Sequence, residues 1–260
     1  MTGAALVTGG ARRLGRAMVL ELAERGLDVA IHYHTGAEEA EALAAEIRDG
    51  GLGAVALGAD LLDRAGTAAL VPAATAALGR PLTVLVNSAS LFEHDTVASA
   101  TWESWDRNVG TNLRAPFELT QAFAAQAPRA VPDERGEPVA RACVVNMIDQ
   151  RVRKLTPEFT TYTIAKMGLW ALTRTAAQGL APHIRVNAIG PGPTLIAPRQ
   201  SARHFAEQRA NTILERGSNP EEIRTALRFI LDSPGFTGQL LCVDGGQHLG
   251  WLTPDVRGLE

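Results

Sequence analysis

Seven short apolar runs alternate along this chain with longer segments of helical period, and this alternation limits the fold more than any other feature. Each run is apolar at successive positions, as expected of strands covered on both faces. The alternation predicts an α/β fold: a doubly wound parallel sheet of about seven strands with helices on both faces, and ligands at the carboxyl ends of the strands. The runs span residues 4–7, 28–33, 53–57, 82–86, 142–147, 184–189 and 239–243.

Signals between the runs predict where helices and connections lie. The stretch "TGAE" at 35–38 has the spacing of a capping box and predicts a helix start. The stretch 127–141 is rich in proline and charge and predicts an exposed connection. Because the strand pattern resumes after this connection, we expect a single domain over residues 1–260.

Composition narrows the possible partners and location. A formal net charge of −3 and a pI near 6.1 give no basic field for nucleic acid or an anionic membrane surface. No apolar run approaches the roughly 20 residues of a membrane helix, and the first residues lack an export signal. Cys143 and Cys242 lie in apolar runs, which favours buried thiols and a cytoplasmic protein. We expect no metal site, because ligand spacing is absent around His94, His183, His204 and His248.

A glycine-rich turn follows the first run, in the stretch "TGGARRLGR" at 8–16. Gly9, Gly10 and Gly15 stand between a strand and a helix, which predicts a tight turn facing a pyrophosphate with backbone N–H groups and the positive end of a helix dipole. The turn residues expected to bind the dinucleotide are Gly9, Arg12, Arg13 and Leu14.

The end of the second run indicates which dinucleotide is bound. Free ribose hydroxyls are usually held by an acid at this position, whereas this run ends "IHYHTG" without one. Arg12, His34 and Thr35 could donate to a ribose phosphate, so we expect NADPH in preference to NADH. His34 could equally be an ordinary histidine at a strand end.

Small polar residues end the fourth run, in the stretch "VLVNSAS" at 84–90, and Asp60 lies just past the third run. Asn87, Ser88 and Ala89, with Ser90 after them, would leave an open floor for the nicotinamide ribose. Asp60, with Leu61 beside it, is expected to meet the adenine, although a helix cap is an alternative role for Asp60.

The stretch "YTIAK" places Tyr162 and Lys166 four residues apart, on a helix that Thr156 and Pro157 are expected to start. Moving the pKa of a tyrosine from about 10 to about 7 takes roughly 4 kcal/mol. One ammonium about 4 Å away supplies that amount at an effective dielectric of about 20. We therefore predict that Lys166 activates Tyr162 for proton transfer; a solvated helix face is the alternative.

In the order and spacing of its motifs the chain resembles the short-chain dehydrogenase/reductase family. The matching motifs are Thr8-Gly9 with Gly15, Asn87-x-Ala89, Asn112, Tyr162-x-x-x-Lys166, Pro191-Gly192 and Asp244-Gly245-Gly246. The resemblance implies a Rossmann-type fold, a homotetramer, Tyr162 as proton donor, Lys166 assisting it and binding the ribose, and Asn112 supporting a proton-relay water. It also implies cofactor contacts from Pro191, Gly192 and Thr194.

One departure from the family concerns the substrate. Most members carry a serine thirteen residues before the tyrosine, where its hydroxyl donates to a carbonyl; here that residue is Asp149. A carboxylate disfavours a developing alkoxide by like-charge repulsion. It favours a substrate with N–H donors, or protonates an imine nitrogen if its own pKa is raised.

Another departure is Arg13, which replaces the usual middle glycine of the turn. A guanidinium could bridge the pyrophosphate and a flat heteroaromatic ring, and Phe92 could stack on that ring or serve as core packing. With Ser90 and the spacing from Asp149 to Tyr162, these residues resemble the pteridine and dihydromonapterin reductases. In that subfamily the residues that hold the pterin would be Arg13, Ser90, Phe92, Asp149 and Tyr162.

The sequence thus predicts an NADPH-dependent reductase of dihydropterins, acting on dihydrobiopterin, dihydromonapterin or dihydrofolate. Hydride transfer would be coupled to protonation by Tyr162, aided by Lys166 and Asp149. The segment 195–215 is expected to form a lid over the substrate. Two alternatives remain: a reductase of a ketone or other small carbonyl compound, and a non-catalytic dinucleotide sensor.

Overall fold

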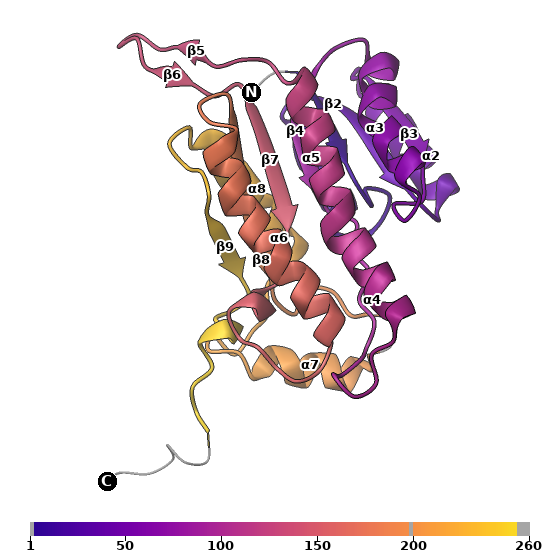
Figure 1. The fold of residues 1–260 in the computed structure, drawn as a ribbon, viewed down its shortest axis with the longest axis vertical. Helices are drawn as coiled ribbons and strands as arrows, with labels where there is room; N and C mark the ends of the chain where they lie inside the picture. Colours follow the sequence, from indigo (N-terminus) through magenta and orange to yellow (C-terminus); the bar gives the residue numbers. More distant parts are fainter. Residues whose placement is uncertain (1–2, 198–199, 254–260) are drawn as a thin grey trace.

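A seven-stranded parallel sheet forms the centre of the molecule (Figure 1), with strand order β3-β2-β1-β4-β7-β8-β9. The computed structural model describes residues 3–197 and 200–253. All seven predicted strands are present, with ends that differ from the prediction by no more than two residues. The strands are β1 (Ala4–Val7), β2 (Asp28–Tyr33), β3 (Ala54–Gly58), β4 (Leu82–Asn87), β7 (Ala142–Met147), β8 (Ile184–Pro191) and β9 (Leu240–Val243).

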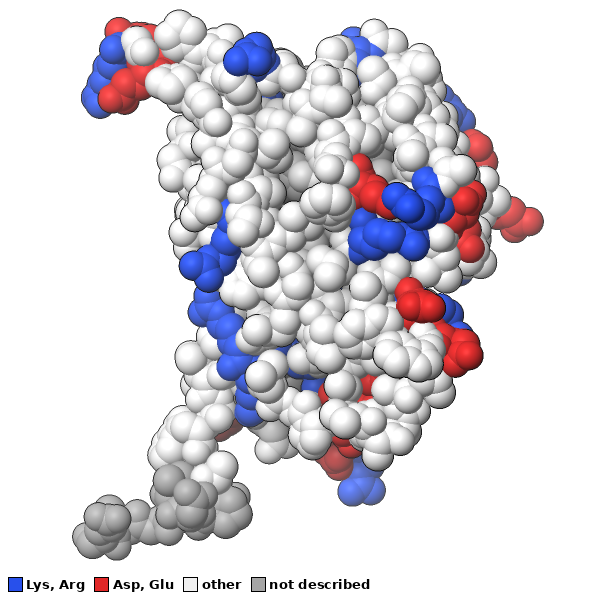
Figure 2. Space-filling model, viewed as in Figure 1, with Lys and Arg blue, Asp and Glu red and all other residues white. Residues whose placement is uncertain are grey.

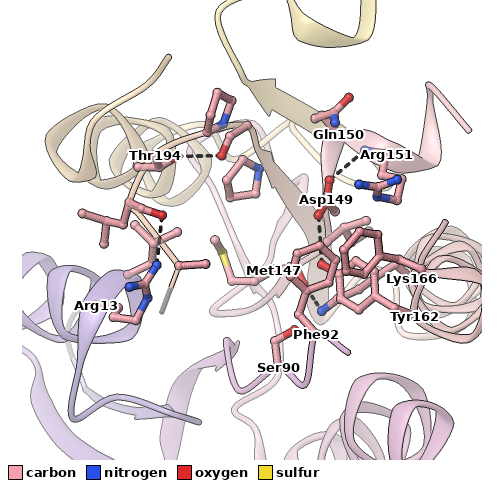
Figure 3. A pocket seen from close by; sticks show the side chains of 18 of the residues that line it. Arg13, Ser90, Phe92, Met147, Asp149, Gln150, Arg151, Tyr162, Lys166 and Thr194 are labelled. Carbon is pink, nitrogen blue, oxygen red and sulfur yellow. Dashed lines mark hydrogen bonds between the residues drawn. The ribbon is translucent and has the colours of Figure 1, made fainter. Parts of the chain in front are cut away.

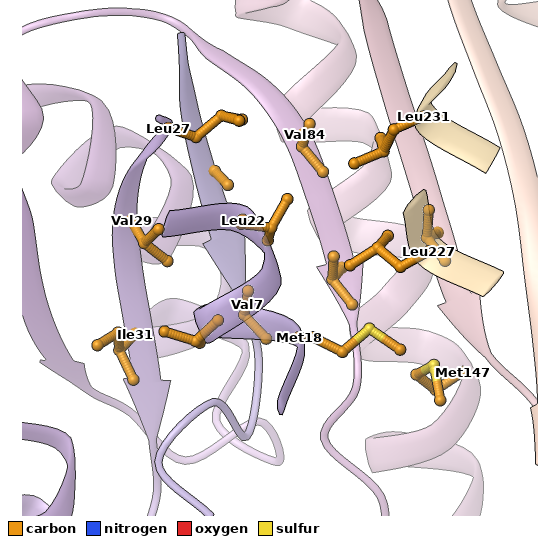
Figure 4. Close-up of a cluster of buried hydrophobic side chains, with 14 of the residues drawn as sticks. Val7, Met18, Leu22, Leu27, Val29, Ile31, Val84, Met147, Leu227 and Leu231 are labelled. Atoms are coloured by element: carbon orange, nitrogen blue, oxygen red, sulfur yellow. The ribbon is translucent and has the colours of Figure 1, made fainter. Parts of the chain in front are cut away.

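Helices cover both faces of this sheet, because its inner strands are apolar on both sides. Alternate strand residues pack against α1 and α8 (Figure 4) and against α2 on one face, and against α3, α5 and α6 on the other. Two shorter helices, α4 and α7, lie near the carboxyl ends of the strands. The helices are α1 (Arg13–Glu24), α2 (Ala37–Asp49), α3 (Arg64–Leu78), α4 (Trp102–Val109), α5 (Ala115–Gln126), α6 (Thr160–Gly179), α7 (Ala202–Ala210) and α8 (Pro220–Asp232).

The sheet changes direction between β1 and β4. From β1 the chain winds outward through β2 and β3, then returns to add β4 on the other side of β1. At this point the loops after the two strands diverge, which opens a crevice at their carboxyl ends. In Figure 1, α7 crosses below the ends of β7 and β8.

Two local predictions need correction. The capping box at 35–38 is not formed, because Gly36 adopts a left-handed conformation (φ 102°) and α2 begins at Ala37 without a side-chain cap. The stretch 127–141 is exposed as predicted, but it also contains a short antiparallel hairpin, β5 (Val131–Pro132) with β6 (Pro138–Val139).

The face that carries α5 and α6 shows few charged side chains along these helices (Figure 2). Phe117 on α5, and Ile164 and Met167 on α6, are exposed there. Within residues 3–197 and 200–253, no helix combines the length and apolar character needed to cross a bilayer.

Candidate active site

A cavity of about 770 Å³ lies at the carboxyl ends of the central strands (Figure 3). Its walls come from the turn after β1, the segment after β4, the segment after β7, helix α6 and the lid segment. These segments are far apart in sequence and meet because parallel strands end at one edge of the sheet. The predicted site residues that line the cavity are Gly9, Arg12, Arg13, Leu14, Ser88, Ala89, Ser90, Phe92, Asp149, Tyr162, Lys166, Pro191, Gly192 and Thr194.

The other predicted site residues lie outside this lining: His34, Thr35, Asp60, Leu61, Asn87 and Asn112. Leu61 is 5% exposed and packs in the core beneath α3. Asp60 is exposed and accepts from the Leu62 N–H (2.9 Å), and the alternative role of a helix cap does not apply to it. Asp63 caps α3 instead, because it stands directly before the helix.

The turn after β1 is held by two side chains that sequence reasoning did not assign to the site. The Thr8 hydroxyl accepts from the N–H groups of Ser88 (2.9 Å) and Ala89 (3.0 Å), which joins the ends of β1 and β4. The Gly9 N–H donates to Nδ1 of buried His32 (3.1 Å), whose Nε2 therefore donates to Ala59 O (3.1 Å). Burial lowers the pKa of His32, which favours this neutral ring.

The start of α1 fits a pyrophosphate. Its N-cap residue, Arg12, makes no side-chain cap, so the first N–H groups of the helix are left to the crevice. Gly15 permits the tight turn: a Cβ at this residue would lie 2.0 Å from Gly9 O. Unsatisfied donors and the positive end of the helix dipole attract an anion.

Arg12 lies beside the loop in which the sequence predicts a ribose phosphate. Its guanidinium packs against Gly36, in the loop that also carries His34 and Thr35. The structure also places an acidic residue beside Arg12: Glu39 on α2 accepts from Arg12 Nε (2.9 Å) and Nη2 (2.5 Å). A phosphate at this position would therefore compete with the Glu39 carboxylate for Arg12.

Arg13 connects the turn to the lid segment. It adopts a left-handed conformation (φ 55°), which accounts for the glycine usual at this position. Its guanidinium donates to Ile196 O (2.7 Å) and Leu195 O (3.0 Å), as Figure 3 shows on the side of the cavity opposite Tyr162. The lid segment also supplies cavity residues from α7, including His204 and Phe205. Positions 198 and 199 of the predicted lid lie outside the described residues.

Tyr162, Lys166 and Asp149 lie together on the side of the cavity opposite Arg13, and a hydrogen bond joins Tyr162 to Asp149. Tyr162 Oη donates to Asp149 Oδ2 (3.0 Å), and Asp149 Oδ1 accepts from the Arg151 N–H (2.8 Å). Lys166 is 1% exposed, and its Nζ donates to Met147 O (2.9 Å). The prediction that α6 starts at Thr156 and Pro157 is wrong, since the helix begins at Thr160, but Tyr162 and Lys166 still share one face.

The protonation states of this group follow from its burial. Burial raises the pKa of Asp149, although the Arg151 N–H and guanidinium oppose the shift. Burial lowers the pKa of Lys166 to about 8, against the pull of the Asp149 charge. Burial, and then the charge and hydrogen bond of Asp149, raise the pKa of Tyr162 well above 10.

The predicted activation of Tyr162 to a pKa near 7 is therefore wrong for this structure. Desolvation and the Asp149 carboxylate raise the pKa of the phenol, and they outweigh a hydrogen bond with Ser90 and the charge of Arg151, which lower it. Tyr162 keeps its proton and offers it through a hydrogen bond that Asp149 accepts.

Asn112 supports the loop that carries Ser90. It lies in a π-helical turn, Gly110–Arg114, between α4 and α5, and is fully buried. Its Oδ1 accepts from Ser90 Oγ (2.9 Å) and its Nδ2 donates to Leu91 O (2.9 Å). A π-turn inside a helix often marks a functional site, and here it turns the amide toward the segment after β4.

Phe92 belongs to an aromatic wall beside Tyr162. Its ring stacks on Phe159 at 4.2 Å between centroids and lies 4.5 Å from the Tyr162 ring at a tilt of 57°. The Arg151 guanidinium lies over the Phe159 ring, 5.0 Å from its centre. Phe92 thus both packs against Phe159 and lines the cavity.

A doubly wound sheet, an anion-binding turn and a Tyr–Lys pair at one crevice define a dinucleotide-dependent oxidoreductase. Comparison with known proteins identifies the family. The sequence model of a family described as enoyl-(acyl carrier protein) reductase matches residues 9–248. The chain belongs to the short-chain dehydrogenase/reductase family.

Similar proteins include reductases with different substrates. The 3-oxoacyl-[acyl-carrier-protein] reductase FabG of Staphylococcus aureus is 31% identical over 255 residues, covering 96% of this chain and 99% of that protein. FolM alternative dihydrofolate reductase 1 from Brucella suis, solved in complex with NADP, is 43% identical with a TM-score of 0.90, covering 97% of this chain and 98% of that one. A blue fluorescent protein from a metagenomic library, solved with NADPH, is 31% identical with a TM-score of 0.83, covering 94% and 97%.

Proposed function

We propose that this protein is an NADPH-dependent reductase of dihydropterin-type substrates. The observation that carries the proposal is the carboxyl group of Asp149, hydrogen-bonded to Tyr162 at the position where the family resemblance implies a serine hydroxyl. A carboxyl whose pKa is raised can hold a proton for a ring nitrogen, and in its ionised form it accepts N–H donors. Pterins present such nitrogens on a flat ring.

The chain's own residues have distinct tasks in this reaction. NADPH supplies the hydride when it is bound. The turn after β1 and the start of α1 would hold the pyrophosphate, and Arg12, beside the loop after β2, would bind the ribose phosphate. Lys166, fixed by Met147 O, is placed beside the ring of Tyr162 (5.5 Å to its centroid) and neutralises negative charge as the proton leaves.

The ring of the substrate would lie between the cofactor and the aromatic wall. Phe92 offers an apolar face, and Ser90, held by Asn112, offers a hydroxyl. To contact the ring or the pyrophosphate, the Arg13 guanidinium would exchange its hydrogen bonds to the backbone oxygens of Leu195 and Ile196 for bonds to the ligand. The similarity to FolM, an alternative dihydrofolate reductase, supports this substrate class.

A second candidate is a 3-oxoacyl or other carbonyl reductase, which the FabG relatives favour. Tyr162 and Lys166 would serve that reaction too. Asp149 argues against it, because a carboxylate beside a developing alkoxide raises the barrier. A sensor without catalysis does not account for a buried Tyr–Lys–Asp group.

A panel of substrates tests the proposal. We expect NADPH oxidation with dihydrobiopterin, dihydromonapterin or dihydrofolate, and little with simple ketones or a 3-oxoacyl thioester. Rates are compared as kcat/KM at one pH. Turnover of the thioester or a ketone, with none of any dihydropterin, would remove the pterin assignment and leave the reductase.

The ion pair between Arg12 and Glu39 predicts two opposite changes in cofactor affinity. Arg12→Ala is expected to raise KM for NADPH about tenfold or more, because a charge-assisted contact to the ribose phosphate is lost. Glu39→Gln frees Arg12 and is expected to lower KM for NADPH about two- to fivefold, since the pair is exposed. KM for NADH should hardly change in either variant; an equal change for both cofactors would contradict the assignment of Arg12.

We further propose that the protein is a homo-oligomer, as the family resemblance implies. The sparsely charged face over α5 and α6, with Phe117, Ile164 and Met167 exposed, supports self-association through these helices.

A further inference from the structure

Helix α6 carries both Tyr162 and Lys166, and its start is held by a residue from another segment. Phe159 precedes the helix and makes no side-chain cap. The N–H of Thr161, in the first turn, donates instead to Asp95 Oδ1 (3.2 Å), and the Thr161 hydroxyl donates to Asp95 Oδ2 (2.5 Å). A carboxylate is a favourable acceptor at the positive end of a helix.

Asp95 is 3% exposed and connects three segments of the site. It follows Phe92 by three residues, in the segment after β4. Its Oδ2 is also within 3.4 Å of the Ser104 hydroxyl, which belongs to the capping box of α4. Its backbone oxygen accepts from the Phe159 N–H (2.7 Å). Within the described parts of the chain no cation forms an ion pair with Asp95. Its carboxyl group is bound instead by the Ser104 hydroxyl and by the N–H and hydroxyl of Thr161 at the start of α6.

Phe159 connects the hydrogen bonds of Asp95 to the aromatic residues beside Tyr162. It adopts a left-handed conformation (φ 58°, ψ 46°), which costs free energy for a residue with a side chain and persists only where surrounding contacts fix it. Its ring stacks on Phe92, and Phe92 contacts Tyr162. Asp95 thus touches both the aromatic wall and the helix that presents the phenol.

We propose that Asp95 is a positioning residue, which fixes the start of α6 and the Phe92–Phe159 stack so that the Tyr162 hydroxyl stays aligned with Asp149. The role applies to any substrate that Tyr162 protonates, so it goes beyond the proposed pterin chemistry. Alignment errors of about 1 Å can lower an enzymatic rate about 100-fold.

The main test compares Asp95→Ala with a matched cap. Asp63 caps α3 with two backbone bonds, to the N–H groups of Ala65 (3.0 Å) and Gly66 (3.1 Å), and does not line the cavity. Both variants should lose thermal stability. Asp95→Ala is expected to lower kcat about 10- to 100-fold with an unchanged dissociation constant for NADPH, whereas Asp63→Ala should keep its kcat. Equal kcat values for the two variants would overturn the proposal.

Conservative variants keep the test decisive if Asp95→Ala does not fold. In Asp95→Asn the amide oxygen can accept from the Thr161 N–H while its nitrogen donates to the Thr161 hydroxyl, so kcat should return close to the native value. Thr161→Val keeps the shape and the backbone bond but removes the hydroxyl bond, and should lower kcat several-fold. A fully active Thr161→Val together with an inactive Asp95→Asn would contradict positioning by these bonds.

A spectroscopic readout separates position from stability. The chain contains two tyrosines, Tyr33 and Tyr162, so fluorotyrosine labelling gives two ¹⁹F resonances that Tyr33→Phe assigns. We expect Asp95→Ala to shift or broaden the Tyr162 resonance and leave that of Tyr33 in place, while Asp63→Ala moves neither. An unmoved Tyr162 resonance in folded Asp95→Ala would exclude the positioning role.

Discussion

Tyr162→Phe is expected to lower kcat about 10²- to 10⁴-fold, the range typical for loss of a positioned proton donor. Phenylalanine keeps the contact with the Phe92 ring, while the hydrogen bond to Asp149 disappears. Lys166 is held by Met147 O and does not depend on the phenol. NADPH should therefore bind with nearly unchanged affinity, which a direct titration measures alongside kcat.

The matched control is Tyr33→Phe, which removes the other tyrosine hydroxyl of the chain. Tyr33 ends β2 and does not line the cavity, so kcat should stay at the native value. A Tyr162→Phe enzyme with native kcat would show that the proton comes from another group. A protein whose cellular role survives Tyr162→Phe despite lost turnover would favour the dinucleotide sensor.

The fold was predictable because its signals are local. Each central strand is buried on both faces, so an apolar run identifies it without knowledge of its neighbours. Tyr162 and Lys166 share a face of any helix that contains both, even when the predicted helix start is wrong. The order of the motifs placed the turn after β1 and the end of β4 at one edge of the sheet.

The hydrogen bonds that position the site residues were not predictable, because they join residues that are distant in sequence. Asp95 meets Thr161 across 66 positions, and Arg13 meets the lid carbonyls across more than 180. His32 illustrates a different reason. In a strand buried on both faces, alternation of side chains does not show which residues are buried. The sequence therefore did not predict that buried His32 accepts from the Gly9 N–H while His34 is exposed.

Electrostatics was the least predictable property. The spacing between Lys166 and Tyr162 can be read from the sequence, but the pKa of the phenol depends on how much water remains and on where Asp149 lies. Likewise, Arg12 was predicted to donate to a ribose phosphate, and only the three-dimensional placement of α2 brings Glu39 to its guanidinium.

Asp149→Ser should reverse the substrate preference of the enzyme. Serine restores the hydroxyl that donates to a carbonyl in most of the family, so activity with ketones should rise. Turnover of dihydropterins should fall about 100-fold or more, because the carboxyl that shares a proton with Tyr162 is lost. Undiminished pterin turnover in this variant would contradict the role assigned to Asp149.

The pH dependence distinguishes proton transfer from simple binding by Asp149. Burial raises its pKa, so the protonated form survives to higher pH than for an exposed aspartate. If this form protonates the substrate, kcat/KM is constant below the raised pKa and falls as the pH rises through it. Asp149→Asn can still accept from the Arg151 N–H and contact Tyr162, but it carries no transferable proton. We expect Asp149→Asn to lower kcat and to abolish this alkaline fall; an unchanged pH profile would assign the fall to another group, such as Lys166, whose pKa is about 8.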